Sequence, residues 1–392
     1  MRILAIETSC DDTGISILEV KKSGKSDIFK ILANNINSQV KIHAEFGGVF
    51  PMMAKREHQK NLPILLEETI KQAKVKIEKI DVIAVTTGPG LEPALWTGIV
   101  FAKELSLKYN IPIIPVNHME GHIFSIFPKK GKTFTINSDK KIFPMLTLLV
   151  SGGHTELVLI KDWFKYKKIG QTRDDAAGEA FDKVARMIGL QYPGGPEISR
   201  LANIEREITG SSKIFKFSGP RMREDEVPDH ENSNILLSPS IQLPRPMIYS
   251  KNYDFSFSGL KTAVLYLIRD MKEKNPNILK DINIKQKIAC EFENAVVETL
   301  VYKTIKAIKE YKINTLIVGG GVSANTYLQE IMKKEIKKLR KSDFLNVKTH
   351  FPIKSLTGDN AIMIAIAGYY QAKNKKPVKN LNKIKAEGNL SL

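Results

Sequence analysis

The 392-residue sequence predicts an α/β protein of two related lobes with a central cleft. A unit of strand, tight turn and strand occurs twice, at the start of the chain and again from residue 143, which indicates a duplicated fold. After each unit, apolar strands alternate with helix-like stretches, the pattern of α/β proteins. At about 150 residues per domain, the length agrees with two or three domains or lobes.

The first lobe is expected to span residues 1–128, because the polar stretch 129–141 separates the halves. Its strands are rich in Ile, Leu and Val, and small polar residues or Gly mark its turns. The predicted elements are, in order, the strand Arg2–Glu7, the turn 8–14, the strand Ile15–Val20, the strand Asp81–Thr87 that ends at Gly88-Pro89-Gly90, the helix Ala94–Tyr109 and the strand Ile111–Val116.

The second lobe is expected over residues 140–370, and its last helix is the one element that we leave open to pack back on the first lobe. Two further segments stand apart by composition. Residues 218–243 are polar and rich in Pro, so we expect an exposed insertion; residues 372–392 are rich in Lys and Asn, so we expect a basic mobile tail. The predicted elements are the strand Phe143–Val150, the turn 151–155, the strand Glu156–Ile160, the helix Asp174–Gly189, the helix Lys285–Tyr311, the strand Thr315–Val318, a helix ending near Leu339 and the helix Asp359–Gln371.

The composition excludes several classes of protein. No apolar run reaches the length of about 18 residues that a membrane span needs, and the acid Glu7 comes too early for a signal peptide. Two cysteines, Cys10 and Cys290, are too few for a disulfide framework or a Cys-rich zinc site. We therefore expect a soluble cytoplasmic protein that does not bind a membrane.

The chain carries 60 Lys and Arg against 42 Asp and Glu, a net charge of +18. Two explanations stay open for this excess. It fits a polyanion partner such as nucleic acid, and it equally fits surface lysines in a chain whose Lys, Ile and Asn content follows coding bias.

Three Gly-rich turns follow predicted strands, after Glu7, after Val150 and after Val318. Glycine lets backbone N–H groups approach a phosphate closely, although each turn by itself is also a common hairpin. None of them matches a P-loop or a dinucleotide fingerprint. Two duplicated hairpin loops together with a strand–Gly-Gly-Gly–helix turn are the architecture of actin-like ATPases and sugar kinases, so the three together indicate nucleotide binding.

His118 and His122 lie four residues apart, which places both imidazoles on one face of a helix and suits one metal ion. The alternative is a pair of histidines with no ligand. The motif His-Met-Glu-Gly-His differs from the zincin motif, because Glu120 stands at the third position, so the metalloprotease base is missing. Asp359 is a candidate third ligand or a helix N-cap. Two His and one carboxylate suit Fe(II) or Zn(II).

Glu179 and Asp182 lie three residues apart on a predicted helix. They fit either a solvated acidic face or a carboxylate that binds ribose hydroxyls, and composition does not choose between the two.

Taken together, the motifs resemble the TsaD family in its bacterial and organellar branch, in order from residue 1 to about 370. The motifs are Ile6–Gly14, Gly88–Leu91, Asn117–His122, Leu149–Thr155, Asp174–Lys183, Tyr192–Pro196, Phe255–Thr262, Gly319–Asn325 and Gly358–Asn360. The resemblance implies an actin-like/Hsp70/sugar-kinase (ASKHA) fold. It also implies a tRNA N6-adenosine threonylcarbamoyltransferase, which moves threonylcarbamoyl from threonylcarbamoyl-adenylate to N6 of adenosine 37 in tRNAs that read ANN codons.

The same resemblance implies the roles of individual residues, one divalent metal ion per subunit and protein partners. Fe(II) is the expected ion and Zn(II) the alternative. The expected partners are tRNA, the adenylate and TsaB-like and TsaE-like proteins. The metal ligands would be His118, His122 and Asp359; the phosphate and acyl region would be lined by Leu149, Val150, Ser151, Gly152 and Gly153; and the ribose and base would be contacted by Asp182, Gly195 and Asn325.

Two other functions compete with this one, a metallo-glycopeptidase that would use the His pair and a non-enzymatic actin-like ATPase scaffold. The missing Glu at the second motif position argues against the first. The sequence assigns no general base: His154 is close to the Gly-rich turn, yet a structural role fits it equally well.

Overall fold

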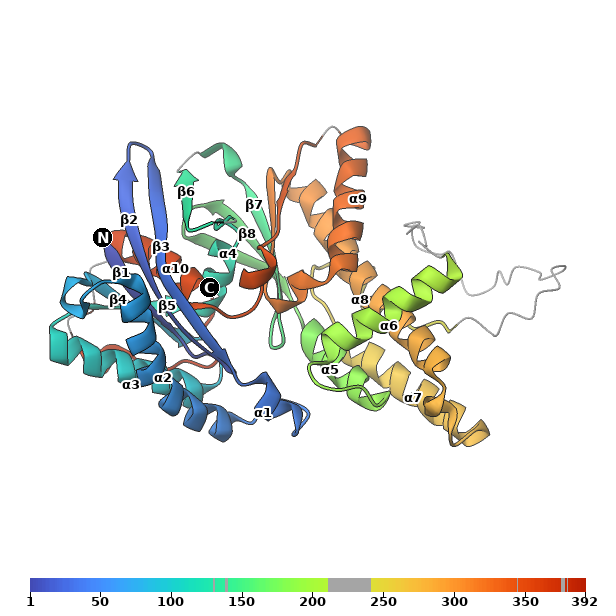
Figure 1. The fold of residues 1–392 in the computed structure, drawn as a ribbon. Coiled ribbons are helices and arrows are strands. Elements are labelled where there is room, and N and C mark those ends of the chain that lie inside the picture. Colours follow the sequence, from blue (N-terminus) through green and yellow to red (C-terminus); the bar gives the residue numbers. More distant parts are fainter. Residues whose placement is uncertain (130, 138–139, 211–240, 344, 375–377, 379) are drawn as a thin grey trace.

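The computed structural model describes the chain except for residues 130, 138–139, 211–240, 344, 375–377 and 379. Figure 1 shows two halves side by side, each built around its own sheet, with α4 between them. No described helix has the length and apolar character needed to cross a membrane.

The first half holds a six-stranded sheet in the order β5-β4-β1-β2-β3-β6. Its described elements are β1 (Arg2–Glu7), β2 (Asp12–Ser23), β3 (Ser26–Ser38), α1 (Val40–Ala44), α2 (Pro51–Ala73), β4 (Val82–Gly88), α3 (Glu92–Tyr109), β5 (Ile113–Asn117), α4 (His118–Phe124) and β6 (Thr133–Asn137).

The second half holds a five-stranded sheet in the order β11-β10-β7-β8-β9. Its described elements are β7 (Met145–Val150), β8 (Thr155–Asp162), β9 (Lys165–Gln171), α5 (Ala177–Met187), α6 (Gly194–Thr209), α7 (Ser258–Lys274), α8 (Ile282–Tyr311), β10 (Thr315–Gly319), α9 (Thr326–Ser342) and β11 (Lys348–His350). The chain then continues into α10 (Ala361–Asn374), which packs on the first sheet.

The two sheets repeat one topology, which confirms the α/β fold of two related lobes. In the first sheet, β1 pairs antiparallel with β2 and parallel with β4, and β4 pairs parallel with β5. In the second, β7 pairs antiparallel with β8 and parallel with β10, and β10 pairs parallel with β11. The hairpins β1–β2 and β7–β8 are therefore equivalent, and their turns occupy equivalent places in the two lobes.

Alternating residues of β1 explain why this strand is apolar along its whole length. Side chains of a strand point to opposite faces in turn, and both faces of the first sheet are covered. Ile3 and Ala5 belong to a core shared with α10, whereas Leu4 and Ile6 belong to a core shared with α2 and α3. The final helix α10 thus lies on the first sheet, although it follows the second lobe in the chain.

The helix α4 joins the two lobes. Its side chains Met119 and Ile123 pack with Met145 and Leu149 on one face of the second sheet, and α4 also packs against α10 of the first lobe. Every residue of α4 is buried, so its position is determined by both lobes.

Two expectations about the borders of the lobes need correction. The stretch 129–141, expected to separate the lobes, contains β6, which pairs with β3 in the first sheet. Its two apolar residues, Phe134 and Ile136, alternate with polar ones and are buried, as in a half-buried strand. The first lobe therefore extends beyond residue 128.

The second correction concerns the mobile tail expected at residues 372–392. Residues 372–374 belong to α10, residues 375–377 and 379 lie outside the described residues, and residues 380–392 contact the first lobe. Ile384 is buried in the core of the first lobe, and the backbone N–H of Glu387 donates to the carbonyl of Thr87 at 2.8 Å. These few apolar and backbone contacts outweigh the polar composition. The exposed insertion expected at 218–243 lies outside the described residues except for 241–243, of which Leu243 is buried.

Candidate metal centre and active-site cleft

The histidine pair of the candidate site is carried by the short helix α4. Asn117 caps this helix, because its side-chain oxygen accepts the backbone N–H of Met119 at 2.8 Å and that of Glu120 at 3.3 Å. The helical spacing then places His118 and His122 on one face, with ring centroids 4.6 Å apart.

Asp359 reaches the same place from the start of α10. The side chain that caps α10 is Asn360, whose oxygen accepts the N–H of Met363 at 3.0 Å. Asp359 is therefore not needed as the cap, and its Oδ1 lies 3.3 Å from His118 Nε2 and 3.4 Å from His122 Nε2. The structure thus brings together the three residues that the sequence suggested as metal ligands.

The donor atoms of these three side chains fit one divalent ion. One ligand atom from each lies within 4.8 Å of the other two, and two imidazoles with one carboxylate form a common site for Zn(II) or non-haem Fe(II). Both ring nitrogens of His122 are buried, and neither has a hydrogen-bond partner among the described residues. A buried polar atom of this kind is costly unless a ligand satisfies it.

Charge interactions within the cluster shift its protonation. Burial by itself would lower the pKa of His118, but the carboxylates of Asp359 and Glu7 outweigh burial and raise that pKa to about 10. Burial keeps the pKa of His122 below its ordinary value. Although burial opposes its ionisation, the two histidines hold the pKa of Asp359 below its ordinary range. The carboxylate is thus ionised at neutral pH, as a metal ligand must be.

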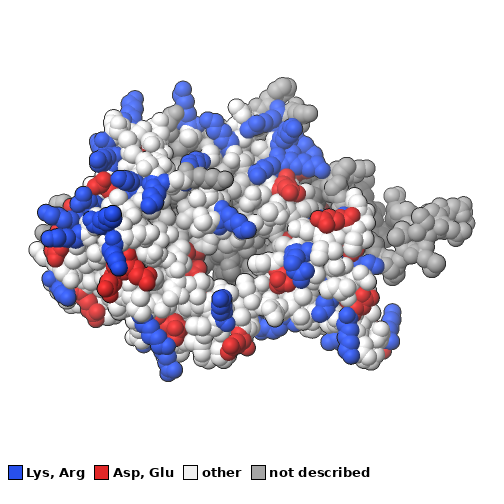
Figure 2. All heavy atoms as spheres, viewed as in Figure 1, with Lys and Arg blue, Asp and Glu red and all other residues white. Residues whose placement is uncertain are grey.

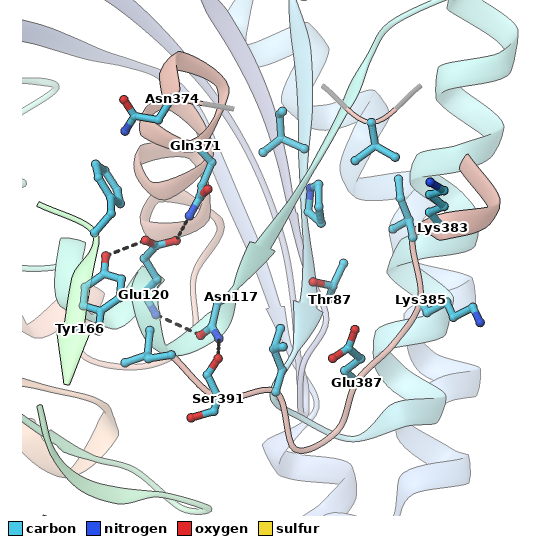
Figure 3. A pocket seen from close by; sticks show the side chains of 17 residues that line it. Thr87, Asn117, Glu120, Tyr166, Gln371, Asn374, Lys383, Lys385, Glu387 and Ser391 are labelled. Carbon is cyan, nitrogen blue, oxygen red and sulfur yellow. Dashed lines mark hydrogen bonds between the residues drawn. The ribbon is translucent and has the colours of Figure 1, made fainter. Parts of the chain in front are cut away.

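The carboxylate of Glu120 lies between Tyr166 and Gln371, as Figure 3 shows. One carboxylate oxygen accepts the hydroxyl of Tyr166 at 2.6 Å, and the other accepts the side-chain amide of Gln371 at 2.7 Å. These residues line a separate cavity of about 620 Å³ on the other side of α4. Glu120 therefore joins β9 and α10 to α4 and is not placed to act as a protease base.

The Gly-rich turn between β7 and β8 presents backbone rather than side chains. Leu149 and Val150 are buried in the two cores of the second lobe. Ser151 is engaged within the turn, since its backbone N–H donates to the carbonyl of His154 at 2.8 Å. Gly152 and Gly153 are exposed, and the space beside their α carbons is open. A ligand can therefore approach the main chain of these two glycines closely.

Asp182 lies in a second hollow, which is formed by both lobes. This cavity of about 420 Å³ is lined by Ala44, Glu45 and Gly47 beside α1 and by Asp182, Arg186 and Tyr192 of the second lobe. Asp182 accepts the backbone N–H of Gly194 at 2.7 Å, and burial raises the pKa of its carboxyl. The adjacent Gly195 has open space at its α carbon. Asp182 and Gly195, which the resemblance assigned to one ligand, are therefore neighbours.

Asn325 is held by three contacts within the second lobe. Its side-chain oxygen accepts the N–H of Leu328 at 2.8 Å and caps α9. Its amide nitrogen donates to Ser199 Oγ at 3.0 Å and to Glu293 Oε1 at 2.6 Å. A ligand that used this amide would have to replace one of these partners.

Asp11, in the turn between β1 and β2, and Asp12, the first residue of β2, were not singled out from the sequence as site residues. Burial raises the pKa of both carboxyl groups, to about 7 for Asp12, and the charge of Asp359 contributes in the same direction. One side-chain oxygen of each is buried without a hydrogen-bond partner among the described residues. The sequence signal that could have indicated them is a pair of adjacent acidic residues in the turn predicted at residues 8–14. A carboxyl group that titrates near neutrality is suited to proton transfer.

Lysines and arginines are spread over the face drawn in Figure 2, and a group of them covers α9. Lys333, Lys334 and Lys337 of this helix are exposed, whereas the apolar residues between them face the core. The helix therefore presents a basic face to solvent.

Comparison with known proteins gives a consistent result. A family model described as TsaD, tRNA N6-adenosine threonylcarbamoyltransferase, matches residues 30–366. The tRNA N6-adenosine threonylcarbamoyltransferase of Dictyoglomus turgidum is 43% identical over 370 residues, which are 94% of this chain and 93% of that protein. The enzyme of the same name from Thermosipho africanus is 43% identical over 392 residues, 100% of both chains.

Among solved structures, HypF of T. kodakarensis superimposes with a TM-score of 0.52 at 12% identity, covering 96% of this chain and 48% of that one. A likeness at this identity shows a shared fold alone, and this chain spans about half of HypF.

Proposed function

The chain belongs to the TsaD family of tRNA N6-adenosine threonylcarbamoyltransferases, and we propose that its inter-lobe cleft carries out that reaction with a metal ion held by His118, His122 and Asp359. It is a transferase whose substrate is tRNA. We further propose that the donor is threonylcarbamoyl-adenylate and that the acceptor is N6 of adenosine 37 in tRNAs reading ANN codons. We propose that the reaction takes place in the cytoplasm.

One observation carries the metal proposal. Three side chains from two distant segments, α4 and the start of α10, converge to within 4.8 Å, and the buried nitrogens of His122 have no hydrogen-bond partner among the described residues. A divalent ion bound there would supply Lewis acidity toward a carbamoyl or phosphate oxygen. Fe(II) and Zn(II) both suit this donor set.

The chemistry is transfer of an acyl group. The N6 nitrogen forms a bond to the carbamoyl carbon, the bond from that carbon to the phosphate oxygen breaks, AMP leaves, and N6 loses a proton. Because the N6 lone pair is delocalised into the adenine ring, correct positioning must supply much of the acceleration.

The chain offers groups suited to the other steps. The accessible backbone at Gly152 and Gly153 is suited to hold the phosphate or the developing negative charge. Asp182, which lines the hollow between the lobes, and Gly195, which follows the Gly194 that donates to Asp182, are suited to the ribose and base of the adenylate. Asp12, whose carboxyl titrates near pH 7, is suited to take the N6 proton.

The two competing functions are not supported. A metallo-glycopeptidase of the zincin type would use a glutamate of the histidine motif as its base, and the glutamate of this motif, Glu120, instead bonds Tyr166 and Gln371. A scaffold without catalysis does not need a metal site, whereas His118, His122 and Asp359 form a cluster suited to one ion.

The helices α2 and α3, which pack side by side, support the proposal of protein partners. They expose five large apolar side chains, of which Ile64 is 58% and Leu107 is 75% exposed. Met52, Trp96 and Val100 are the other three. Apolar side chains grouped on two adjacent helices favour a protein interface. TsaB-like and TsaE-like proteins are the proposed partners.

The function is tested by incubating the metal-loaded protein and its partner proteins with threonylcarbamoyl-adenylate and unmodified tRNA. The modified adenosine is measured by mass spectrometry of the digested tRNA, and AMP is measured in the supernatant. We expect the two products in equal amounts, and none with a tRNA that carries guanosine at position 37. Release of AMP without modified adenosine would count against a transferase.

The metal site has its own test. Substituting His118→Ala or Asp359→Ala removes one of three ligands, so we expect each variant to lose the metal. The metal content of the purified proteins is the measurement. Full metal content in both variants would refute this assignment of the metal ligands, whereas the proposed transfer reaction would still stand or fall by the assay above.

A further inference from the structure

Glu7 is a buried acidic residue with no role in the reaction proposed above. It is the last residue of β1, a strand whose other residues from Ile3 to Ile6 are apolar and fully buried, and its own exposed fraction is 0%. A carboxylate in such a place costs several kcal/mol unless it is hydrogen bonded and paired with charge. Its partners therefore indicate what it does.

Both oxygens of Glu7 have partners. Oε1 accepts the backbone N–H of Ser9 at 2.6 Å, and Oε2 accepts the hydroxyl of Thr86 at 2.5 Å. Oε2 also lies 3.2 Å from Nδ1 of His118. The first two bonds fix the orientation of the carboxylate, and the third contact directs it at the imidazole.

The two ring nitrogens of His118 thus face different groups. Nδ1 lies beside Glu7, with Ser9 Oγ also 3.2 Å away, whereas Nε2 faces Asp359 at 3.3 Å. A hydroxyl both donates and accepts, so Ser9 does not select a tautomer. An ionised carboxylate only accepts, so Glu7 favours a proton on Nδ1, as Asp359 does on Nε2. A divalent ion shared by Asp359 and His118 would take the place of the proton on Nε2, with Nδ1 still protonated toward Glu7.

We propose that Glu7 is a positioning residue for the metal, holding His118 in the tautomer whose Nε2 faces the site. This inference rests on the proposed function, because it needs His118 to be a ligand. Histidine ligands commonly donate their second N–H to a carboxylate, which fixes the ring and increases the basicity of the ligating nitrogen. Here the carboxylate comes from the central strand of the first lobe and the histidine from the helix between the lobes.

The alternative is that Glu7 only stabilises the turn after β1 through Ser9 and Thr86. The variant Glu7→Gln separates the two roles, because glutamine keeps the size and an acceptor oxygen but not the charge. The matched control is Asp27→Asn. Asp27 is also a buried carboxylate of the first sheet, with partners Tyr369 at 2.8 Å and Lys373 at 3.2 Å, and it lies in another part of that sheet.

The experiment measures the Zn(II) affinity of the full chain by competition with a chromophoric chelator at several pH values between about 7 and 9, because protons compete with the ion for the histidine nitrogens. We expect Glu7→Gln to weaken binding by about 10- to 100-fold, and Asp27→Asn to bind as the wild type does. In the Zn(II)-loaded wild type, nitrogen NMR of labelled histidine should show the proton of His118 on Nδ1, and in Glu7→Gln this signature should change.

The outcomes separate the two proposals. If the wild type binds metal and Glu7→Gln binds it within about twofold, Glu7 has only a structural role, and the metal site stands. If the wild type itself binds no metal, the metal site fails and this inference fails with it. Should Glu7→Gln not fold, Thr86→Val removes one donor to Glu7 without touching His118. A severalfold weaker affinity in that variant supports the proposal, and unchanged affinity overturns it.

Discussion

Asp12 shows how a single residue acquires reactivity from its surroundings. It is the first residue of β2, and burial, with the charges of Asp359 and Asp11 adding to it, raises the pKa of its carboxyl from 3.8 to about 7. Its backbone is held in the sheet, where it pairs with Ser38 of β3. A carboxyl in this position changes charge within the neutral range, which ordinary aspartates do not.

We predict that the transfer rate rises with pH through a pKa no higher than about 7, because only ionised Asp12 accepts a proton. A divalent ion held by His118, His122 and Asp359 would lower the pKa of Asp12, because its positive charge favours the ionised carboxylate. Asp12→Asn should lower kcat by about 10²- to 10⁴-fold and abolish this limb of the pH profile. An Asp12→Asn enzyme that keeps the wild-type limb would show that another group is the base.

Stability gives a second readout that is independent of catalysis. The folded pKa of Asp12 lies above the unfolded one, so between about pH 4 and 7 the folded state binds more protons than the unfolded state. Ionisation of Asp12 therefore lowers the free energy of unfolding as the pH rises across this window. Denaturation curves of Asp12→Asn should lack this contribution.

At the residue scale, sequence spacing identified the three proposed metal ligands but not Glu7, the carboxylate that contacts His118. His118 and His122 are recognisable because residues four positions apart lie on the same face of a helix. Asp359 is recognisable because it precedes an apolar helix. Glu7 gave no comparable signal, since an acid at the end of a strand is equally often solvated. Its burial results from the pairing of β1 with β4 and the packing of α4, contacts that span 79 and 111 residues along the chain.

The segment 380–392 is the element whose role changed most. Polar composition suggested a mobile tail, yet this segment crosses the first lobe and approaches the loop after β4. The carbonyl of Gly388 accepts the N–H of Gly90 at 3.0 Å. A Cβ atom at Gly88 would lie 2.0 Å from the carbonyl oxygen of Glu387, and one at Gly90 would lie 2.5 Å from the carbonyl oxygen of Ser9. The loop 88–90 is therefore packed between this segment and the turn that carries Asp11.

We predict that Ile384→Ala lowers the free energy of unfolding by about 2–5 kcal/mol, because it opens a cavity where the side chain is only 3% exposed. Urea denaturation is the measurement. The exposed neighbour Lys385 provides the control, and Lys385→Ala should change stability by no more than about 0.5 kcal/mol. Equal, small effects of both substitutions would mean that the segment is not held in the core.

Element prediction succeeded for several segments rich in apolar residues, but the elements β3, α2, β9, α6 and α7 were not predicted. The strand Arg2–Glu7 and the helices near residues 94–109 and 285–311 lie where the sequence placed them. The strand β6 was missed because a five-residue half-buried strand between polar residues resembles a loop. The segment 380–392 was misjudged because a few buried contacts, here Ile384, decide the position of a segment that is polar on average.

At the scale of the whole molecule, part of the net charge of +18 lies on one helix face. The basic face of α9 (Lys333, Lys334 and Lys337) is exposed and belongs to the second lobe (Figure 2). A tRNA is much larger than the cleft, so phosphate contacts outside the cleft position it while the cleft selects the base. Surface lysines elsewhere remain compatible with simple composition.

We predict that changing the three lysines of the α9 face to glutamine reduces the salt dependence of tRNA binding. With about 0.7–0.9 units of slope per phosphate contact, the slope of log K against log salt should fall by about 2. The rate at saturating tRNA should not change, because these lysines do not touch the reacting groups. Lys21, Lys22 and Lys25, exposed at the β2–β3 hairpin, form the control set. An equal loss of slope in both triple variants would mean that no surface is preferred.

The central claim is that transfer to tRNA depends on the metal held by His118, His122 and Asp359. Its most direct test is the initial rate of threonylcarbamoyl-adenosine formation by metal-free protein, with partners present, as Fe(II) or Zn(II) is added back in known amounts. The account predicts a rate that rises in proportion to bound metal and levels off at one ion per chain. A full rate without metal, or no product at full occupancy, would contradict it.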